Sequence, residues 1–200
     1  MPDELVTQSV ELAGGELRLL QPREAAELPD EGDTEWAPVA PYWSVLWRSG
    51  VALADALDGV GLEGRRVVEL GCGLAAPSLA AARAGATVLA TYDAPDALAL
   101  AARNAEANGL SIETERIDWT RPQQLVDRGP FDLVLAADIL YERSSVGALL
   151  AVLPRLAPQV WLAAPARSAG EAFLDQAQSR WSIETRERGA VRLHLLTLRT

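Results

Sequence analysis

From residue 64 onward, short apolar segments alternate with longer stretches rich in alanine, leucine and arginine. The apolar segments have a strand-like composition and lie at 66–70, 86–91, 112–117, 131–137 and 159–164. Runs such as VVEL, TVLAT and FDLVLAA lack the alternation of a sheet with one face in water, as expected when helices cover both faces. This pattern predicts an α/β fold built on a doubly wound, mostly parallel sheet.

The two ends of the chain depart from this repeat. Residues 5–20 alternate apolar and polar on both sides of a Gly-Gly pair, which predicts a β-hairpin because glycine accepts the positive φ of a tight turn. Residues 181–200 have strand composition on both sides of a Gly-Ala pair, so two antiparallel strands are expected to close the sheet. We therefore expect a hairpin and an acidic connection over 1–40 and the α/β domain over 41–200, within one globular unit.

The charge and composition of the chain restrict its partners. A formal net charge of -10 argues against nucleic acid, because binding to phosphate backbones draws most of its affinity from cationic side chains. No run of about 18 uncharged apolar residues is present, and the acidic start MPDE is unlike a signal peptide. Cys72 is the only cysteine, which excludes an internal disulfide and a cysteine-based zinc site. We expect a cytoplasmic monomer with no membrane contact and no bound metal.

A glycine-containing turn follows the first strand of the repeat. The stretch ELGCGLAAPS, residues 69–78, runs from that strand through Gly71 and Gly73 into a predicted helix. In an open α/β sheet, ligands bind beyond the carboxyl ends of the strands, where glycine lets the backbone approach and helix amides face the ligand. The turn also matches the G-x-G-x-x-A variant of the dinucleotide fingerprint. By itself it therefore fits either NAD or S-adenosylmethionine (SAM).

Three neighbouring features favour SAM over NAD. Glu69 lies two residues before the first glycine, where a carboxylate disfavours a pyrophosphate but suits the cationic sulfonium and amino groups of SAM. Asp118 and Trp119 follow the third strand, where they can hold the amine and the face of an adenine. The paired terminal strands differ from the second half of a dinucleotide-binding fold. We therefore predict SAM as the cofactor.

The stretch VVELGCGLAAPSLAAARAGATVLATYD resembles the glycine motif and second strand of the class I, seven-β-strand SAM-dependent methyltransferases. The resemblance covers residues 41–200 and implies a Rossmann-like sheet of six parallel strands and one inserted antiparallel strand, here with an N-terminal β-hairpin extension. It also implies a ribose-binding carboxylate directly after the second strand. Tyr92 occupies that position and Asp93 follows, so we assign Asp93 to the ribose, with Asp96 as the alternative.

Two further stretches are similar to protein-lysine methyltransferases. PYWSVLWRSGVALADAL, residues 41–57, resembles the PFW-x-x-x-W-x-G-G segment of the electron transfer flavoprotein β-subunit lysine methyltransferases. FDLVLAADILYERSS resembles the end of strand four in the broader lysine methyltransferase group, whose D-x-x-Y signature is here Asp138 to Tyr141. The resemblance implies that Asp138 and Tyr141 orient the target amine. Trp43 and Trp47 lie four residues apart, which fits either two core residues of one helix or one ring that closes over SAM or the target lysine, and we assign Trp47 to the cofactor.

These observations lead to one functional prediction with two alternatives. We expect a SAM-dependent N-methyltransferase of a protein lysine, with the electron transfer flavoprotein β-subunit as the first candidate substrate. The alternatives are a small-molecule amine N-methyltransferase on the same fold, since a fold does not determine its substrate, and a SAM-binding partner protein without catalysis. The predicted catalytic residues are Asp138 and Tyr141. The predicted cofactor-binding residues are Trp47, Glu69, Gly71, Gly73, Asp93, Asp118 and Trp119.

Overall fold

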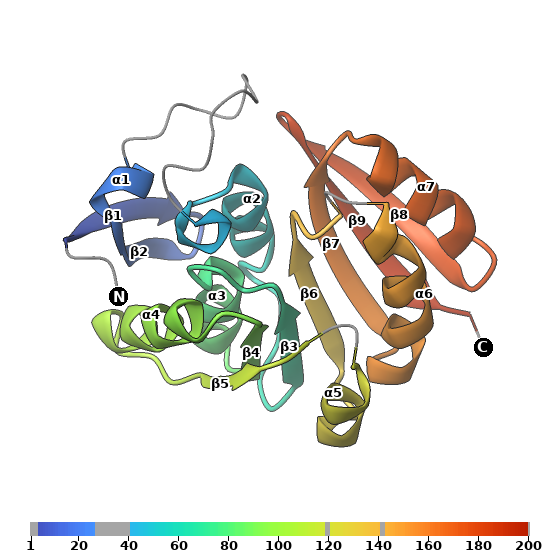
Figure 1. Ribbon diagram of the computed structural model, residues 1–200, viewed down its shortest axis with the longest axis horizontal. Coiled ribbons are helices and arrows are strands. Elements are labelled where there is room, and N and C mark those ends of the chain that lie inside the picture. Colours follow the sequence, from blue (N-terminus) through green and yellow to red (C-terminus); the bar gives the residue numbers. More distant parts are fainter. Residues whose placement is uncertain (1–3, 27–40, 119–120, 141–142, 200) are drawn as a thin grey trace.

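The computed structural model of the protein describes residues 4–26, 41–118, 121–140 and 143–199. Its centre is a seven-stranded sheet in the order β5-β4-β3-β6-β7-β9-β8 (Figure 1). The strands are β3 (Arg66–Leu70), β4 (Thr87–Tyr92), β5 (Glu113–Arg116), β6 (Leu133–Ala137), β7 (Gln159–Pro165), β8 (Trp181–Arg188) and β9 (Val191–Leu198). The strands from β3 to β7 pair in parallel, and β9 lies antiparallel between β7 and β8. The predicted mostly parallel sheet closed by two antiparallel strands is confirmed.

Helices cover both faces of this sheet. The described helices are the short α1 (Arg23–Ala26), the 3-10 helix η1 (Tyr42–Ser44), α2 (Arg48–Ala56), α3 (Ala76–Arg83), α4 (Pro95–Ala107), α5 (Gln123–Arg128), α6 (Ser144–Leu156) and α7 (Ser168–Ala177). One face is covered by α5, α6 and α7, and the other by α2, α3 and α4 (Figure 1). Neighbouring residues of one strand pack on opposite faces. Val68 and Val134 pack in the core beneath α5, α6 and α7, whereas Val67 and Leu135 pack in the core beneath α2, α3 and α4. Because both faces are buried, the strands read as continuous apolar runs.

The predicted N-terminal hairpin consists of β1 (Leu5–Leu12) and β2 (Gly15–Pro22). Its apolar side chains belong to the same core as α2 and α3. Two side-chain amides bind the outer edge of β2: Oδ1 of Asn104 in α4 accepts from Leu20 N at 2.7 Å, and Oδ1 of Asn108, the C-cap of α4, accepts from Arg18 N at 2.9 Å. These amides satisfy backbone groups that a sheet edge otherwise leaves open.

No helix among the described residues is long and apolar enough to cross a membrane.

Candidate functional site

A cavity of about 730 Å³ opens at the carboxyl ends of the central strands. It lies where the sheet order reverses, because the chain leaves β3 for β4 on one side and returns to β6 on the other. Open α/β sheets bind their ligands at this point, and the volume is typical of a small-molecule site. The described lining comes from η1 and α2, from the glycine turn, and from the ends of β4, β5, β6 and β7.

The glycine turn after β3 adopts a left-handed backbone conformation. Its φ angles are +70° at Gly71, +50° at Gly73 and +66° at Ala75. A Cβ on Gly73 would lie 3.1 Å from the carbonyl oxygen of Trp43. Glycine at 73 is therefore required both by the backbone angle and by the close approach of the segment before α2.

Gly73→Ala is expected to lower the free energy of unfolding by about 1–2 kcal/mol, the cost of a left-handed L-residue, and to weaken SAM binding because Trp43 must move. Urea unfolding and calorimetric titration with SAM measure the two effects. Gly147→Ala is the matched control, because Gly147 lies in α6 with nothing within 4 Å of the added Cβ. We expect that variant to be more stable by about 0.5–1 kcal/mol. Equal stability of Gly73→Ala and the unmodified protein would contradict the steric argument.

Glu69 is a buried carboxyl group on the cavity lining. Its residue is 1% exposed, and the amide and hydroxyl of Ser78 both donate to Glu69 Oε2, the amide at 2.9 Å. Burial raises the pKa of Glu69 to about 8, although the hydrogen bonds from Ser78 act in the opposite direction. A cation in the cavity would favour the ionised form of this carboxyl. The predicted role of Glu69 toward a cationic cofactor is compatible with this position.

The acidic residues after β4 and β5 also line the cavity. Asp93 follows β4, and Arg116 Nε donates to its carboxylate at 3.1 Å and to its carbonyl oxygen at 2.8 Å. Asp118 lines the cavity beyond β5. Asp96, the alternative ribose ligand, lies in the first turn of α4 and is not among the described lining residues. The structure therefore brings Asp93 and Asp118 together at the cavity, while Trp119 lies outside the described residues.

Aromatic side chains from the segment before α2 form another part of the lining. Trp47 lies at the N-cap of α2, and its indole nitrogen donates to the carbonyl oxygen of Tyr42 at 3.0 Å. The two rings stack with centroids 6.2 Å apart and an interplanar angle of 22°. Tyr42 is 63% exposed at the cavity rim, so its ring is accessible to a macromolecule. The sequence prediction included Trp47 but missed Tyr42, whose only signal was its place in the PYW stretch at 41–43.

Asp138 follows β6 and also lines the cavity. Its φ of +54° is left-handed, a conformation that aspartate tolerates better than most residues, and its amide donates to the Ala163 carbonyl at 2.8 Å. Arg167 Nη1 forms an ion pair with Asp138 Oδ1 at 2.8 Å. Arg167 was missed at the sequence level. Tyr141, the other predicted orienting residue, lies outside the described residues.

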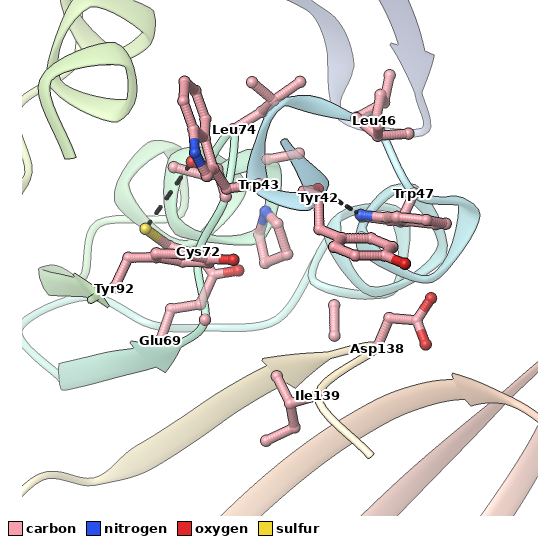
Figure 2. A pocket seen from close by; sticks show the side chains of 18 of the residues that line it. Tyr42, Trp43, Leu46, Trp47, Glu69, Cys72, Leu74, Tyr92, Asp138 and Ile139 are labelled. Carbon is pink, nitrogen blue, oxygen red and sulfur yellow. Dashed lines mark hydrogen bonds between the residues drawn. The ribbon is translucent and has the colours of Figure 1, made fainter. Parts of the chain in front are cut away.

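The cavity has two chemically different sides (Figure 2). Glu69, Cys72 and Tyr92 gather on the left of that view, next to the glycine turn, whereas Tyr42, Trp47 and Asp138 lie on the right. The left side combines the open backbone of the glycine turn with the carboxyl group of Glu69 and the ring of Tyr92, and it fits a cationic cofactor such as SAM. The right side combines aromatic rings with one carboxylate and fits an amine on an aliphatic stem. Among the described residues, no group of three or more His, Cys, Asp or Glu side chains could hold a metal ion.

Comparisons with known proteins show the family to which this chain belongs. Residues 42–179 match a protein family described as lysine methyltransferase. Protein N-lysine methyltransferase METTL21A of Danio rerio is 32% identical over 152 residues, which cover 70% of this chain and 69% of that protein. The electron transfer flavoprotein beta subunit lysine methyltransferase of Rattus norvegicus is 33% identical over 147 residues, covering 67% of this chain and 52% of that protein. The present chain thus spans about half the length of the rat relative.

The solved structures resemble this fold as well. The T. thermophilus 16S rRNA N2 G1207 methyltransferase (RsmC), in complex with AdoMet and guanosine, has a TM-score of 0.69 at 20% identity, covering 99% of this chain and 52% of that one. At this identity the likeness concerns the fold alone. The family match is more specific, because the matched residues 42–179 include every described residue that lines the cavity, from Tyr42 to Arg167. The chain therefore belongs to the lysine methyltransferase family.

Proposed function

We propose that this protein is a SAM-dependent N-methyltransferase whose acceptor is a lysine side chain of another protein. One observation carries the proposal: in a chain of the lysine methyltransferase family, the carboxylate of Asp138 lines the same cavity as the glycine turn. The cofactor and the acceptor carboxylate would thereby share one site. Names of the relatives that specify protein lysines as targets support the same substrate class.

The residues that would hold SAM line the cavity at the glycine turn and at the ends of β4 and β5. The turn at Gly71 and Gly73 would receive the amino-acid part of the cofactor, with Glu69 near its cationic groups. Asp93 would accept from the ribose hydroxyls and Asp118 from the adenine amine. When bound, SAM supplies the methyl group, which the amine nitrogen takes in line as the carbon–sulfur bond breaks.

The acceptor side would prepare the amine for this step. A lysine side chain normally has a pKa near 10.4, so its ammonium must first lose a proton to solvent to expose a lone pair. The stacked rings of Tyr42 and Trp47 would flank the aliphatic stem and exclude water, which favours the neutral amine. Asp138 and Tyr141 would then accept hydrogen bonds from the amine and direct its lone pair. Orientation and desolvation supply most of the acceleration in such a displacement.

The proposed acceptor is a protein and not a nucleic acid, in line with the net charge of -10. The electron transfer flavoprotein β-subunit is the first candidate, because relatives at 33% identity and below are named for it. We also propose that the protein acts as a monomer in the cytoplasm, with no nucleic-acid or membrane partner.

Incubation with tritiated SAM and a lysate of the host tests the proposal, with the labelled products separated by size. We expect label in a protein band, and hydrolysis of that protein to its amino acids should release the label as methyl-lysine. The chain contains no lysine among its 18 basic residues, so it cannot label itself on that side chain. Label found only in small molecules would replace the proposal with an amine N-methyltransferase. Tight SAM binding without any transferred label would replace it with a non-catalytic SAM-binding protein.

A further inference from the structure

Asp138 shares its side of the cavity with a cationic side chain. Arg167 lies just after β7 at the N-cap of α7, and its Nη1 is 2.8 Å from Asp138 Oδ1. The side chain of Asp138 is 8% exposed and that of Arg167 39%, so the carboxylate is largely removed from water while the guanidinium faces the cavity. This is a built-in ion pair at the place where the target amine would arrive.

The fold holds both members of this pair. Strands β6 and β7 are parallel neighbours, so the residues that follow them meet at one edge of the sheet. The amide of Asp138 donates to the Ala163 carbonyl of β7, which fixes the left-handed turn that carries the carboxylate. The pair is therefore a consequence of strand order, although Asp138 and Arg167 are 29 residues apart in the chain.

A lone carboxylate beside a lysine nitrogen has two opposing effects. It accepts a hydrogen bond and so orients the amine, but its charge also stabilises the ammonium form and raises the pKa of that nitrogen. Only the neutral amine carries the lone pair that attacks a methyl group. A cation held against the carboxylate cancels much of its field and leaves its accepting oxygens in place.

We propose that Arg167 is a positioning residue that balances the charge of Asp138, so that the pair accepts a hydrogen bond from the target amine without holding it as an ammonium. This inference rests on the proposed methylation of an amine at Asp138. Arg167 touches the carboxylate and acts on the amine through it.

Other charged and titratable groups face the same region from neighbouring elements. In a small adjoining cavity around Arg167 they are Glu171, Arg192 and His194. Around the main cavity they are Tyr42, Glu69, Cys72, Tyr92, Asp93 and Asp118. Arg192 forms its own ion pair with Glu187. Burial, reinforced by Arg192, lowers the pKa of His194, so this ring is neutral throughout the alkaline range in which a lysine loses its proton. All of these groups are retained when Arg167 alone is changed.

The test compares the pH dependence of methyl transfer in the unmodified protein, Arg167→Gln and Arg167→Lys. The initial rate of label transfer from tritiated SAM to host lysate protein is measured from pH 6.5 to 9.5. For Arg167→Gln we expect the alkaline midpoint of the rate to rise by about one pH unit, the size of shift that one nearby charge produces. The rate should fall about tenfold near pH 7 and approach that of the unmodified protein at the alkaline end. Arg167→Lys should restore the midpoint, because it keeps the charge.

Two comparisons separate this role from a structural one. Arg180→Gln removes an equal charge from an exposed position and should leave the midpoint unchanged. In Asp138→Asn, which carries no carboxylate at 138, the midpoint should fall below that of the unmodified protein, because the guanidinium then acts alone against the ammonium, and a further Arg167→Gln change should raise it again. A rate lowered equally at every pH, with the midpoint unmoved, would overturn the inference and make Arg167 a structural residue. If the unmodified protein transfers no label at any pH, the proposed function itself fails.

Discussion

Replacing Asp138 with asparagine is expected to lower kcat for methyl transfer by roughly 10²–10³-fold, with little change in the dissociation constant of SAM. The carboxylate lines the acceptor side of the cavity, so its loss misdirects the amine without touching the turn at Gly71 and Gly73. Asparagine is preferable to alanine because φ at this position is +54°, which asparagine adopts readily and alanine does not. Single-turnover rates with tritiated SAM and calorimetric titration of the cofactor measure the two quantities.

The exposed Asp175 of α7 provides the matched control, since Asp175→Asn makes the same chemical change away from the cavity. We expect that variant to keep its full rate. Turnover of Asp138→Asn at the level of the unmodified protein would remove the orienting role from Asp138. A large loss of SAM affinity in Asp138→Asn would instead place this carboxylate with the cofactor.

The sheet was predictable because burial on both faces leaves a direct mark on sequence. Each of the five strand segments expected from apolar runs coincides with an observed strand to within two residues at either end. The hairpin turn was harder to place. Leu12 pairs with Gly15, so the two turn residues are Ala13 and Gly14 and not the Gly-Gly pair. Helix α2 explains the shift, because Asp55 accepts a hydrogen bond from the amide of Ala13 at 2.8 Å, and no local pattern encodes that contact.

The candidate site likewise contains residues that the sequence indicates and residues that only the folded structure brings together. Gly71, Asp93 and Asp138 could be chosen from the sequence because each follows a strand of a parallel sheet, and such positions meet at one edge. Arg167 could not, because its partnership with Asp138 depends on β6 and β7 being neighbours. Tyr42 was missed for a similar reason, since its ring is a cavity residue only once η1 is folded back over the glycine turn.

Glu69→Gln is expected to make the protein more stable than its parent at neutral and alkaline pH. The pKa of Glu69 is about 8 in the folded protein and near 4.5 ordinarily, so between these values the folded state binds a proton that the unfolded state lacks. The contribution of this carboxyl to stability is therefore complete below pH 4.5 and is lost as the pH rises through 8. Between pH 5 and 8 the free energy of unfolding falls by roughly 4 kcal/mol because of this carboxyl. A glutamine at 69 does not titrate, so the variant escapes this loss. Urea unfolding across this range, with the exposed Glu106→Gln as control, measures the difference.

The same variant tests whether the carboxyl group of Glu69 acts on the cofactor. If Glu69 faces a cationic group of bound SAM, binding releases its proton, and SAM affinity should rise by up to about tenfold per pH unit as the pH approaches 8. Glu69→Gln should lack this rise. Titration of both proteins with SAM cancels the ionisation of the ligand itself, so the difference between their slopes belongs to residue 69. If SAM affinity depends on pH equally in both proteins, Glu69 only accepts hydrogen bonds from Ser78 at the start of α3. Another group in the cavity would then face the positive charge of the sulfonium.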